Sequence, residues 1–438
     1  MAPSFRPLNM DSTAYLVLSW IGLGFLSLML FLALFEPPLP YRISKRPPLP
    51  LDSNQFRRLI AALGSSTFHP RNQIDVLPNG EVYYAAELEA IRQARHSVNI
   101  EAYIFKKGRV ARAFLDALVE RARSGVEVNM VIDAVGSFST GRRTFNELRA
   151  AGGRVFFYHP IRWFNLPRIN NRTHRELIIV DGKVGFIGGA GFCDHWRYDH
   201  GRKSRKRRWR DTMFRVEGPA VRDLQATFAE NWLETSGEVL ADMEYFRWCE
   251  EVGDSSAMVV ASSPSTGRSA RNRMIFQTLL AAAQKSIHIT TPYFLPDRYA
   301  RAELIRAVKE RGVQVTIMVP GKHSDHLLTR RSSRRLFGRL LRAGAKISEY
   351  QPAMMHAKTL LVDGMWSVVG STNFDHRSFG INDEVNLVVY DPELTQRLEN
   401  DFAADLAHSK AVNYREWSRR SLLERGHEWL GWLLERQQ

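Results

Sequence analysis

The chain has 438 residues, of which 44% are hydrophobic and 24% are charged, a composition typical of a globular rather than a disordered protein. Its length allows two ordinary domains with cores of their own. The formal net charge of +15 indicates a polyanionic partner, either nucleic acid or the anionic face of a membrane. Cys193 and Cys249 lack metal-ligand spacing, which argues against a structural disulfide or zinc site and favours a reducing compartment.

The first predicted element is an apolar helix near the amino terminus. Residues 14–35 carry no charged side chain, and a helix of about 20 residues spans a bilayer core. A cleaved signal peptide is the alternative, but the apolar run is long and no small-x-small cleavage site precedes Glu36. We therefore predict a tail over 1–13 and a transmembrane helix over 14–36. Basic residues gather after this helix, so the positive-inside rule places the rest of the chain in the cytoplasm and makes the membrane the favoured partner over nucleic acid.

Two similar halves are expected after a stiff proline-rich linker over 37–51. The first half is predicted over 52–250 and the second over 251–410, and an amphipathic segment follows over 411–438. In each half a helical run leads into a short strand, and these strands are predicted at 97–100 and at 286–289.

A helix that ends in glycine comes next in each half. Gly125 precedes a Val/Ile-rich strand predicted over 126–132, and Gly312 precedes one predicted over 313–319. The matched order of these landmarks indicates an internal duplication. The alternation of strands and helices indicates α/β layers with a mostly parallel or mixed sheet.

A motif that occurs twice is the most informative pattern. It consists of a histidine, a charged residue two positions later and an aspartate five positions after that. These residues are His174, Glu176 and Asp181 in the first copy, and His356, Lys358 and Asp363 in the second. Each copy runs through an apolar strand, at 177–180 and at 359–362, into small residues that include Gly189 and Ser371. Such residues let a ligand oxygen approach backbone N–H groups.

One face of the second strand combines His356 and Lys358, because alternate residues of a strand point to the same side. The lysine and the nearby amides would hold a phosphate, with the histidine as nucleophile or acid. A single His-x-Lys most often lies on an ordinary surface strand. Two copies with the same spacing favour a catalytic site instead.

At these residues the chain resembles the phospholipase D superfamily, whose mark is a duplicated H-x-K-x4-D motif, and within it the bacterial cardiolipin synthases. The resemblance covers about residues 75–402 and extends to the segments at 171–174, 209–212 and 292–296. It implies two α/β/α sandwich domains related by a pseudo-twofold axis, with one shared active site and neither metal nor other cofactor. It also implies a single-pass protein of the bacterial inner membrane. The oligomeric state stays open.

The implied reaction is a double displacement. One histidine attacks the phosphorus of a phosphodiester to form a phosphohistidine, and the other protonates the leaving alcohol and then deprotonates the incoming one. The resemblance favours His174 as nucleophile and His356 as acid and base, although the sequence leaves the order open. With phosphatidylglycerol as donor and acceptor, the products are cardiolipin and glycerol. A lipid hydrolase, a nuclease and a lipid-binding scaffold without catalysis are the alternatives.

The resemblance also assigns the remaining site residues. Together with His356 and Lys358, the pair Ser371 and Asn373 would complete a phosphate-binding half. Glu384 would orient the opposite histidine, and Asp211 has the comparable place in the first half. The motif aspartates Asp181 and Asp363 belong to the catalytic set, with Asp363 mainly structural. Gly189 and Glu176 would line the substrate site.

The first half departs from the family pattern at two positions, with Glu176 in place of lysine and Gly191 in place of asparagine. A carboxylate beside a phosphodiester is repulsive, by about 4 kcal/mol at about 4 Å with an effective dielectric constant of about 20. Three explanations stay open. Glu176 pairs with an arginine such as Arg172 or orients a histidine; or it accommodates a positive or hydroxyl-rich part of the substrate; or the protein is catalytically weak.

Basic residues are concentrated in three further segments. The run at 202–208 is either a solvated loop or a contact for anionic lipid headgroups. The arginines at 330–335 precede Leu336 and Phe337 and predict an amphipathic helix beside the mouth of the site. The segment at 414–436 mixes tryptophans with arginines and is either a helix docked on the domains or an interfacial helix.

Overall fold

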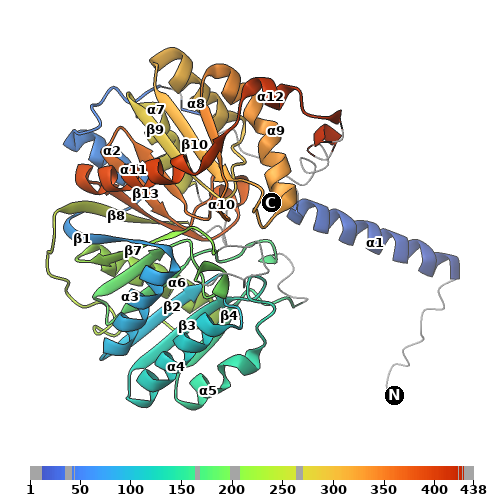
Figure 1. Cartoon of the computed structure of the whole chain (residues 1–438). Helices are drawn as coiled ribbons and strands as arrows, with labels where there is room; N and C mark the ends of the chain where they lie inside the picture. The colour runs from blue at the N-terminus through green and yellow to red at the C-terminus, as the bar shows by residue number, and fades with distance from the viewer. Residues whose placement is uncertain are drawn as a thin grey trace. The chain divides into compact units, whose positions relative to one another are not determined.

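A computed structural model of the chain describes residues 12–34, 42–43, 45–162, 168–197, 208–262, 270–422, 424–426 and 428. The chain forms two compact units, one within residues 1–40 and the other within residues 41–436. Figure 1 shows the elements of both units. The basic run at 202–208, except its last residue, and most of the tail at 1–13 lie outside the described residues.

Helix α1, Ser12–Leu34, is the predicted apolar helix. Its 23 residues correspond to a length of about 34 Å, which exceeds the hydrocarbon core of a bilayer. The window Ser12–Met29 has a mean hydropathy of 1.6, and none of it is buried. By length and composition α1 is able to cross a membrane, as is a signal sequence in the same place.

The second unit is built on one mixed sheet. Its centre is the antiparallel pair of β1, His69–Pro78, and β8, Ser255–Ser262. Outward from β1 the strand order is β7-β6-β5-β2-β3-β4, and outward from β8 it is β14-β13-β12-β9-β10-β11, with β15 at the edge. Strands β2, β3 and β4 are parallel, as are β9, β10 and β11. The two halves repeat one topology, which confirms the predicted duplication.

The elements of the first half have the following bounds. Its other strands are β2 Ser97–Ala102, β3 Glu127–Asp133, β4 Arg154–Tyr158, β5 Leu177–Val180, β6 Val184–Gly188 and β7 Thr212–Glu217. Its helices are α3 Asn79–Gln93, α4 Arg109–Arg123, α5 Asn146–Ala150 and α6 Ala220–Ser236, with short 3-10 turns η1 Arg142–Phe145 and η3 Asp194–Trp196.

The second half follows the same plan. Its strands after β8 are β9 Ser286–Thr290, β10 Gln314–Pro320, β11 Lys346–Tyr350, β12 Thr359–Val362, β13 Trp366–Gly370, β14 Glu384–Tyr390 and β15 Ser409–Ala411. Its helices are α7 Arg271–Ala282, α8 Arg298–Arg311, α9 Leu327–Ala343, α10 His376–Gly380, α11 Pro392–Ala407 and α12 Tyr414–Ser418.

Helices cover both faces of the sheet, and each half has its own core. In the first half α3 and α4 pack on one face through residues such as Tyr84 and Phe114. In the second half α7, α8 and α9 do the same through residues such as Leu279 and Leu304. A third core draws on α6, α11 and strands of both halves, for example Ile187 with Leu387. The two repeats are therefore joined by a shared core and form one compact unit.

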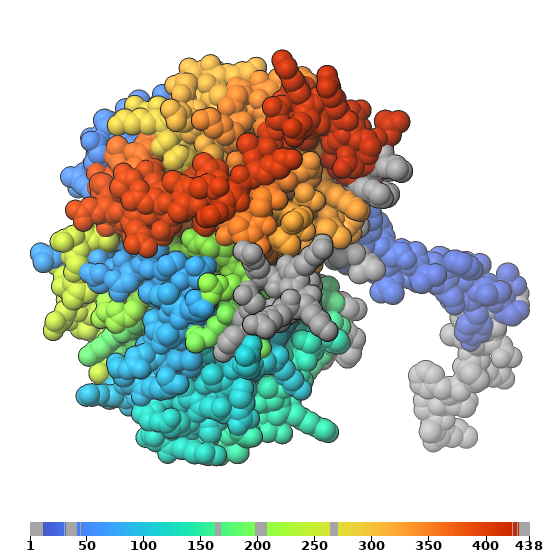
Figure 2. Space-filling view, viewed as in Figure 1, coloured from blue at the N-terminus to red at the C-terminus, as the bar shows by residue number. Residues whose placement is uncertain are grey.

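Helix α2, Asn54–Gly64, belongs to the second half, although it precedes the first half in the chain. Phe56 is fully buried in the second-half core and meets Trp366 edge-on at 5.4 Å between ring centroids. The Trp366 indole N–H donates to the Leu51 carbonyl at 3.0 Å. In Figure 2 the blue atoms of this segment lie among the yellow and orange atoms of the second half. Helix α2 therefore packs with the second half, although the first half was expected to start at residue 52, and Leu51 at the end of the expected linker is buried.

The carboxyl-terminal segment docks on the second half where it is described. Trp417 of α12 donates from its indole N–H to the Arg334 carbonyl at 2.7 Å, and the Arg420 guanidinium stacks over its ring at 3.8 Å. The docked interpretation therefore holds for this part, and residues beyond 428 lie outside the described chain. In α9 the predicted amphipathic helix is confirmed, and both Arg330 and Arg334 bond Glu349.

Candidate active site

The two motif histidines lie where the halves meet, in segments that exchange backbone hydrogen bonds. The His174 N–H donates to the Asp383 carbonyl of the second half at 2.8 Å. The His356 N–H donates to the Arg210 carbonyl of the first half at 2.7 Å. Each histidine thus lies beside a carboxylate-bearing segment of the opposite half, and these contacts join the two halves at a candidate site.

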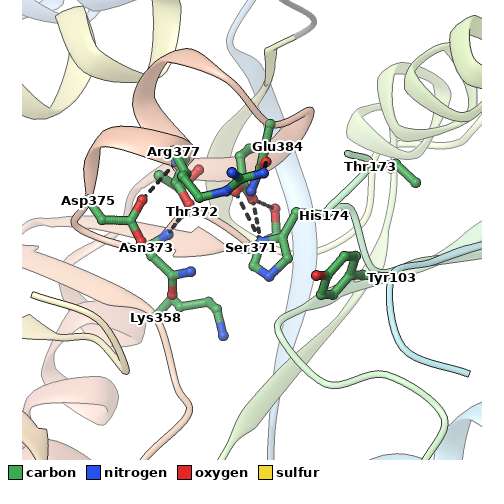
Figure 3. A network of polar contacts seen from close by, with 12 residues as sticks. Tyr103, Thr173, His174, Lys358, Ser371, Thr372, Asn373, Asp375, Arg377 and Glu384 are labelled. Atoms are coloured by element: carbon green, nitrogen blue, oxygen red, sulfur yellow. Dashed lines mark hydrogen bonds and ion pairs between the residues drawn. The ribbon is translucent and has the colours of Figure 1, made fainter. Parts of the chain in front are cut away.

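Glu384, the first residue of β14, holds His174. Its carboxylate oxygens lie 3.0 and 3.1 Å from the His174 Nδ1, and the carboxylate is fully buried. The Ser371 hydroxyl donates to the same carboxylate. Tyr103 meets the imidazole edge-on with 5.0 Å between ring centroids, as Figure 3 shows. Because Nδ1 is engaged, Nε2 is the ring nitrogen left for chemistry.

Asp211 holds His356 in the matching arrangement. The Asp211 Oδ2 lies 2.7 Å from the His356 Nδ1 and accepts a second hydrogen bond from the Trp196 indole at 3.0 Å. The rings of Trp196 and Trp209 both lie 5.3 Å from the His356 imidazole. His356 and Asp211 are buried, so this pair is more enclosed than the His174 pair.

Burial and neighbouring charges set the protonation of this second pair. Burial lowers the pKa of His356, Lys358 lowers it further, and Asp211 raises it in part, leaving it below the ordinary value. Burial raises the pKa of Asp211, but His356 and Lys358 outweigh that effect and bring it below its ordinary range. Asp211 therefore stays ionised, and free His356 favours its neutral form.

Lys358 reaches across to the first half. Its Nζ lies 3.0 Å from the His356 Nδ1 and donates to the His356 carbonyl at 2.8 Å. A Cβ at Gly189 would lie only 2.6 Å from this Nζ, so glycine at that position leaves room for the lysine. Glycine at position 189 therefore has a packing role, and the expectation that its amide is open to a ligand stays a prediction. Burial lowers the pKa of Lys358, while Asp211, Glu384 and Glu176 oppose that shift.

Ser371 and Asn373 lie in the same group, on the loop after β13. The Asn373 side-chain oxygen is buried and accepts no hydrogen bond from the residues that the structure describes. In the view of Figure 3, Asn373 and Lys358 lie on the side of His174 opposite Tyr103. The Asn373 amide N–H groups and the Lys358 ammonium group are donors of the kind that suit a phosphate anion.

Comparison with known proteins identifies the family. A family model described as "Cardiolipin synthase, PLD-like domain" matches residues 88–232 and 276–406. The chain belongs to this cardiolipin synthase, PLD-like family. It is 34% identical over 87% of its length to Cardiolipin synthase 1 of Bacillus anthracis, covering 76% of that protein. It is 33% identical over 88% of its length to a cardiolipin synthase of Geobacillus thermodenitrificans, again covering 76%.

Among solved structures, the chain is similar in fold to a phosphatidylserine synthase of Haemophilus influenzae Rd KW20. The TM-score is 0.67 at 16% sequence identity, and the match covers 88% of this chain and 100% of that one. At this identity the likeness supports the fold alone. It agrees with the two repeats of mixed α/β structure described above.

Glu176, which departs from the family motif, is buried against backbone amides. Its Oε1 accepts from the Tyr103 and Ile104 N–H groups at 3.2 and 3.3 Å. Its Oε2 is buried and has no hydrogen-bond partner among the described residues. Burial raises the pKa of Glu176 well above its ordinary value, against the two backbone hydrogen bonds and Lys358, which lower it. The neutral form is favoured, so the repulsion expected of a carboxylate does not apply to it.

The suggested partners of Glu176 are wrong. Arg172 donates to the carbonyls of Asn171 and His159 at 2.6 and 2.8 Å, and its guanidinium lies 3.6 Å from Asp133. The hydrogen bonds of Glu176 go to backbone amides and not to a histidine. The Glu176 side chain therefore supports the loop that carries Tyr103.

Gly191, the second departure, is coupled to the first. A Cβ at this position would overlap the Ile104 carbonyl and lie 2.9 Å from the Glu176 Oε1. The glutamate and the loop at 103–104 occupy the space that a larger residue 191 needs. The two departures thus form one local change in packing.

Replacing Gly191 by alanine should therefore lower the free energy of unfolding by about 1–3 kcal/mol through overpacking. Gly141→Ala is the matched control, because nothing lies within 4 Å of a Cβ there. Chemical denaturation of both variants measures the difference. Equal stabilities for the two would contradict the coupling of Gly191 with Glu176.

The motif aspartates have a structural role at the other end of their strands. The Asp181 carboxylate accepts from the N–H groups of Arg95, His96 and Ser97 at 2.7–3.2 Å. The Asp363 carboxylate accepts from Gln284, Lys285 and Ser286 at 2.8–2.9 Å. Both aspartates have φ of 54°, in the left-handed region. They secure the starts of β2 and β9. The expectation that they belong to the catalytic set is therefore corrected to a structural role.

Sequence reasoning missed three residues of the site. Tyr103 recurs as Tyr293 after the matching strand, which was a usable signal. No sequence pattern marks Trp196 as a site residue. Its contact with Asp211 arises only from the fold. Asp375 caps α10 by accepting from the Ser378 N–H at 2.8 Å. Burial raises the pKa of Asp375 to about 7, and Glu384 contributes to this shift.

Proposed function

We propose that the protein is a phosphatidyltransferase that joins two phosphatidylglycerol molecules into cardiolipin and releases glycerol. The observation that carries the proposal is the pair of exchanged histidine–carboxylate contacts, His174 with Glu384 and His356 with Asp211. Two histidines held at one junction suit a reaction in which one is phosphorylated and the other moves protons. The family relatives are named cardiolipin synthases, which supports this choice of substrate.

In the proposed reaction the His174 Nε2 attacks the phosphorus of the first lipid, and the bond from phosphorus to the glycerol oxygen breaks. His356 gives its proton to that oxygen. A phosphodiester anion in the site opposes the effect of Lys358 and raises the pKa of His356, so its acid form is populated when substrate is bound. His356 then takes the proton of the second lipid's hydroxyl, which attacks phosphorus and frees His174. Lys358 stabilises the charge on the phosphoryl oxygens.

The decisive experiment follows the products. The full chain is purified in detergent, placed in phosphatidylglycerol vesicles without added metal, and the lipids are identified by mass spectrometry. Cardiolipin with an equal amount of glycerol supports the proposal. Phosphatidic acid as the main lipid product would show a hydrolase, and no turnover would show a binding protein; either result contradicts a synthase.

The proposed location is a bacterial inner membrane, with α1 as a single-pass anchor and the second unit in the cytoplasm. The basic residues that follow α1 support this orientation. Trypsin added to intact spheroplasts should leave the second unit uncut and should cleave it after lysis. Cleavage before lysis would contradict the cytoplasmic orientation.

Replacing Asp211 by asparagine should move the alkaline limb of the pH–rate profile to lower pH. Asp211 raises the pKa of His356, against burial and Lys358, which lower it. Without the carboxylate the pKa of His356 falls further, so the acid form requires lower pH and kcat at neutral pH drops by about 100-fold.

The measurement is kcat and kcat/KM between about pH 5 and about pH 9 in mixed micelles. Asp223→Asn is the matched control, because Asp223 pairs with His69 away from the site. An unshifted alkaline limb in Asp211→Asn would mean that Asp211 does not control His356.

A further inference from the structure

A cavity with an excess of positive charge lies in the first half, beside the edge strand β4. Its volume is about 560 Å³. Its charged or titratable lining residues are Arg142, Arg149, Arg162, Arg168, His159 and Glu234. None of these residues takes part in the proposed mechanism. The cavity therefore has a composition that the reaction at His174 and His356 does not explain.

The single carboxylate of the cavity is already engaged. Glu234 accepts from Arg168 at 3.1 Å and lies 2.9 Å from the His159 Nε2. The Tyr158 hydroxyl donates to it at 3.3 Å. By contrast, Arg142 and Arg149 have no carboxylate partner among the residues that the structure describes. Two guanidinium groups thus face the cavity region without a compensating acid.

Backbone groups fix Arg149 in place. Its guanidinium donates to the Arg142 carbonyl at 2.9 Å and to the Val155 carbonyl at 3.2 Å. Arg142 stacks over Phe157 at 5.6 Å. Burial lowers the pKa of Arg149, and the nearby Arg142 lowers it further, so the two charges repel each other. A guanidinium group has five N–H donors, so Arg149 keeps free donors after its two hydrogen bonds to backbone carbonyls. Two neighbouring guanidinium groups suit a phosphate anion.

Hydrogen bonds of the lining residue His159 link the cavity to the segment that carries His174. The His159 carbonyl accepts from Arg172 at 2.8 Å, and the His159 Nδ1 lies 3.2 Å from the Asn171 carbonyl. Asn171 and Arg172 lead directly to His174 in the chain. On the outside, Ile161 lies between two lining residues and is 59% exposed. An apolar side chain beside an arginine-lined cavity fits a phosphate that carries acyl chains.

We propose that this cavity binds a phosphate group, the headgroup phosphate of an anionic phospholipid or free phosphate. The lipid assignment rests on the proposed function, in which two anionic lipids meet at one site. The cavity then holds the phosphate of the lipid that is not being attacked. That role positions the second substrate and takes no part in bond making.

Isothermal titration with soluble probes tests the cavity. The full chain in neutral detergent carries His174→Ala to prevent turnover, and it is titrated with dihexanoyl-phosphatidylglycerol and, separately, with inorganic phosphate. Arg142→Glu on this background should weaken one binding event about tenfold. Arg143→Glu is the matched control, because Arg143 is exposed in the same turn and does not line the cavity.

The two probes separate the sources of the phosphate. An event sensitive to Arg142→Glu with the lipid alone identifies a lipid headgroup site, and the same event with both probes identifies a general phosphate site; both support the proposal. Isotherms unchanged by Arg142→Glu with both probes overturn it. Binding is measured without turnover, so an Arg142-dependent binding event supports the cavity proposal even if the protein forms no cardiolipin. If the protein is an active synthase but shows no such event, the cavity proposal is refuted and the proposed function is not.

Discussion

Replacing either His174 or His356 by alanine should abolish cardiolipin formation, with a loss of more than about 10³-fold in rate. Each imidazole is held at Nδ1 by a buried carboxylate from the opposite half. Among the residues that the structure describes, no other imidazole contacts the Glu384 or Asp211 carboxylate. The formation of labelled cardiolipin from labelled phosphatidylglycerol measures the loss.

The order of the two histidines is tested with a phosphatidyl ester of p-nitrophenol, a leaving group that needs no proton. His356→Ala should still release about one equivalent of nitrophenolate and then stall, because the phosphohistidine forms at His174. His174→Ala should release none. The reverse pattern would exchange the two roles. His96→Ala serves as the control histidine, since its side chain pairs with Glu244 at the surface.

Replacing Glu176 by lysine, which restores the family motif, should destabilise the protein and raise no rate. The lysine would leave the Tyr103 and Ile104 N–H groups without an acceptor, because an ammonium group only donates. It would also bury an unpaired charge near Lys358, at a cost of about 3–5 kcal/mol. Thermal unfolding and the cardiolipin assay measure the two effects. A faster enzyme with unchanged melting temperature would contradict the packing described for Glu176.

Glu176→Gln is the matched variant, because its amide oxygen can accept both hydrogen bonds. The folded-state pKa of Glu176 is raised by burial, so the unfolded chain loses this proton at lower pH than the folded chain does. The stability of the natural protein therefore falls as pH rises above the pKa of glutamate in the unfolded chain, which is about 4.3. Glu176→Gln should accordingly raise the melting temperature more at about pH 8 than at about pH 5. An equal gain at both values would mean that Glu176 is ionised in the folded protein.

The sequence predicts the repeated framework well because that framework is local. The strands β5 and β12 have the predicted bounds, and the predicted strands after Gly125 and Gly312 begin within one residue of β3 and β10. Both glycines have positive φ, 87° and 70°, as helix ends require. An apolar run after a glycine stop is a signal carried by neighbouring residues, so it survives without knowledge of the fold.

The rest depends on contacts between distant segments. The state of Glu176 follows from its burial against residues 103–104 and Gly191, and no local pattern carries that information. Helix α2 packs on the second half because Phe56 contacts Trp366, which is far from it in the sequence. The contact of Trp196 with Asp211 is of the same kind. These features required the three-dimensional structure.

The exchange of acids between the halves has a consequence for the growing chain. During synthesis, His174 and Asp211 are added to the chain long before Glu384. The hydrogen bond from the His174 N–H to the Asp383 carbonyl likewise forms only after the second half has been made. The half made first therefore contains a histidine without its carboxylate. Under the proposed mechanism this half is inactive, and activity begins only when strand β14 is in place, so the fold delays the proposed nucleophile until synthesis is nearly complete.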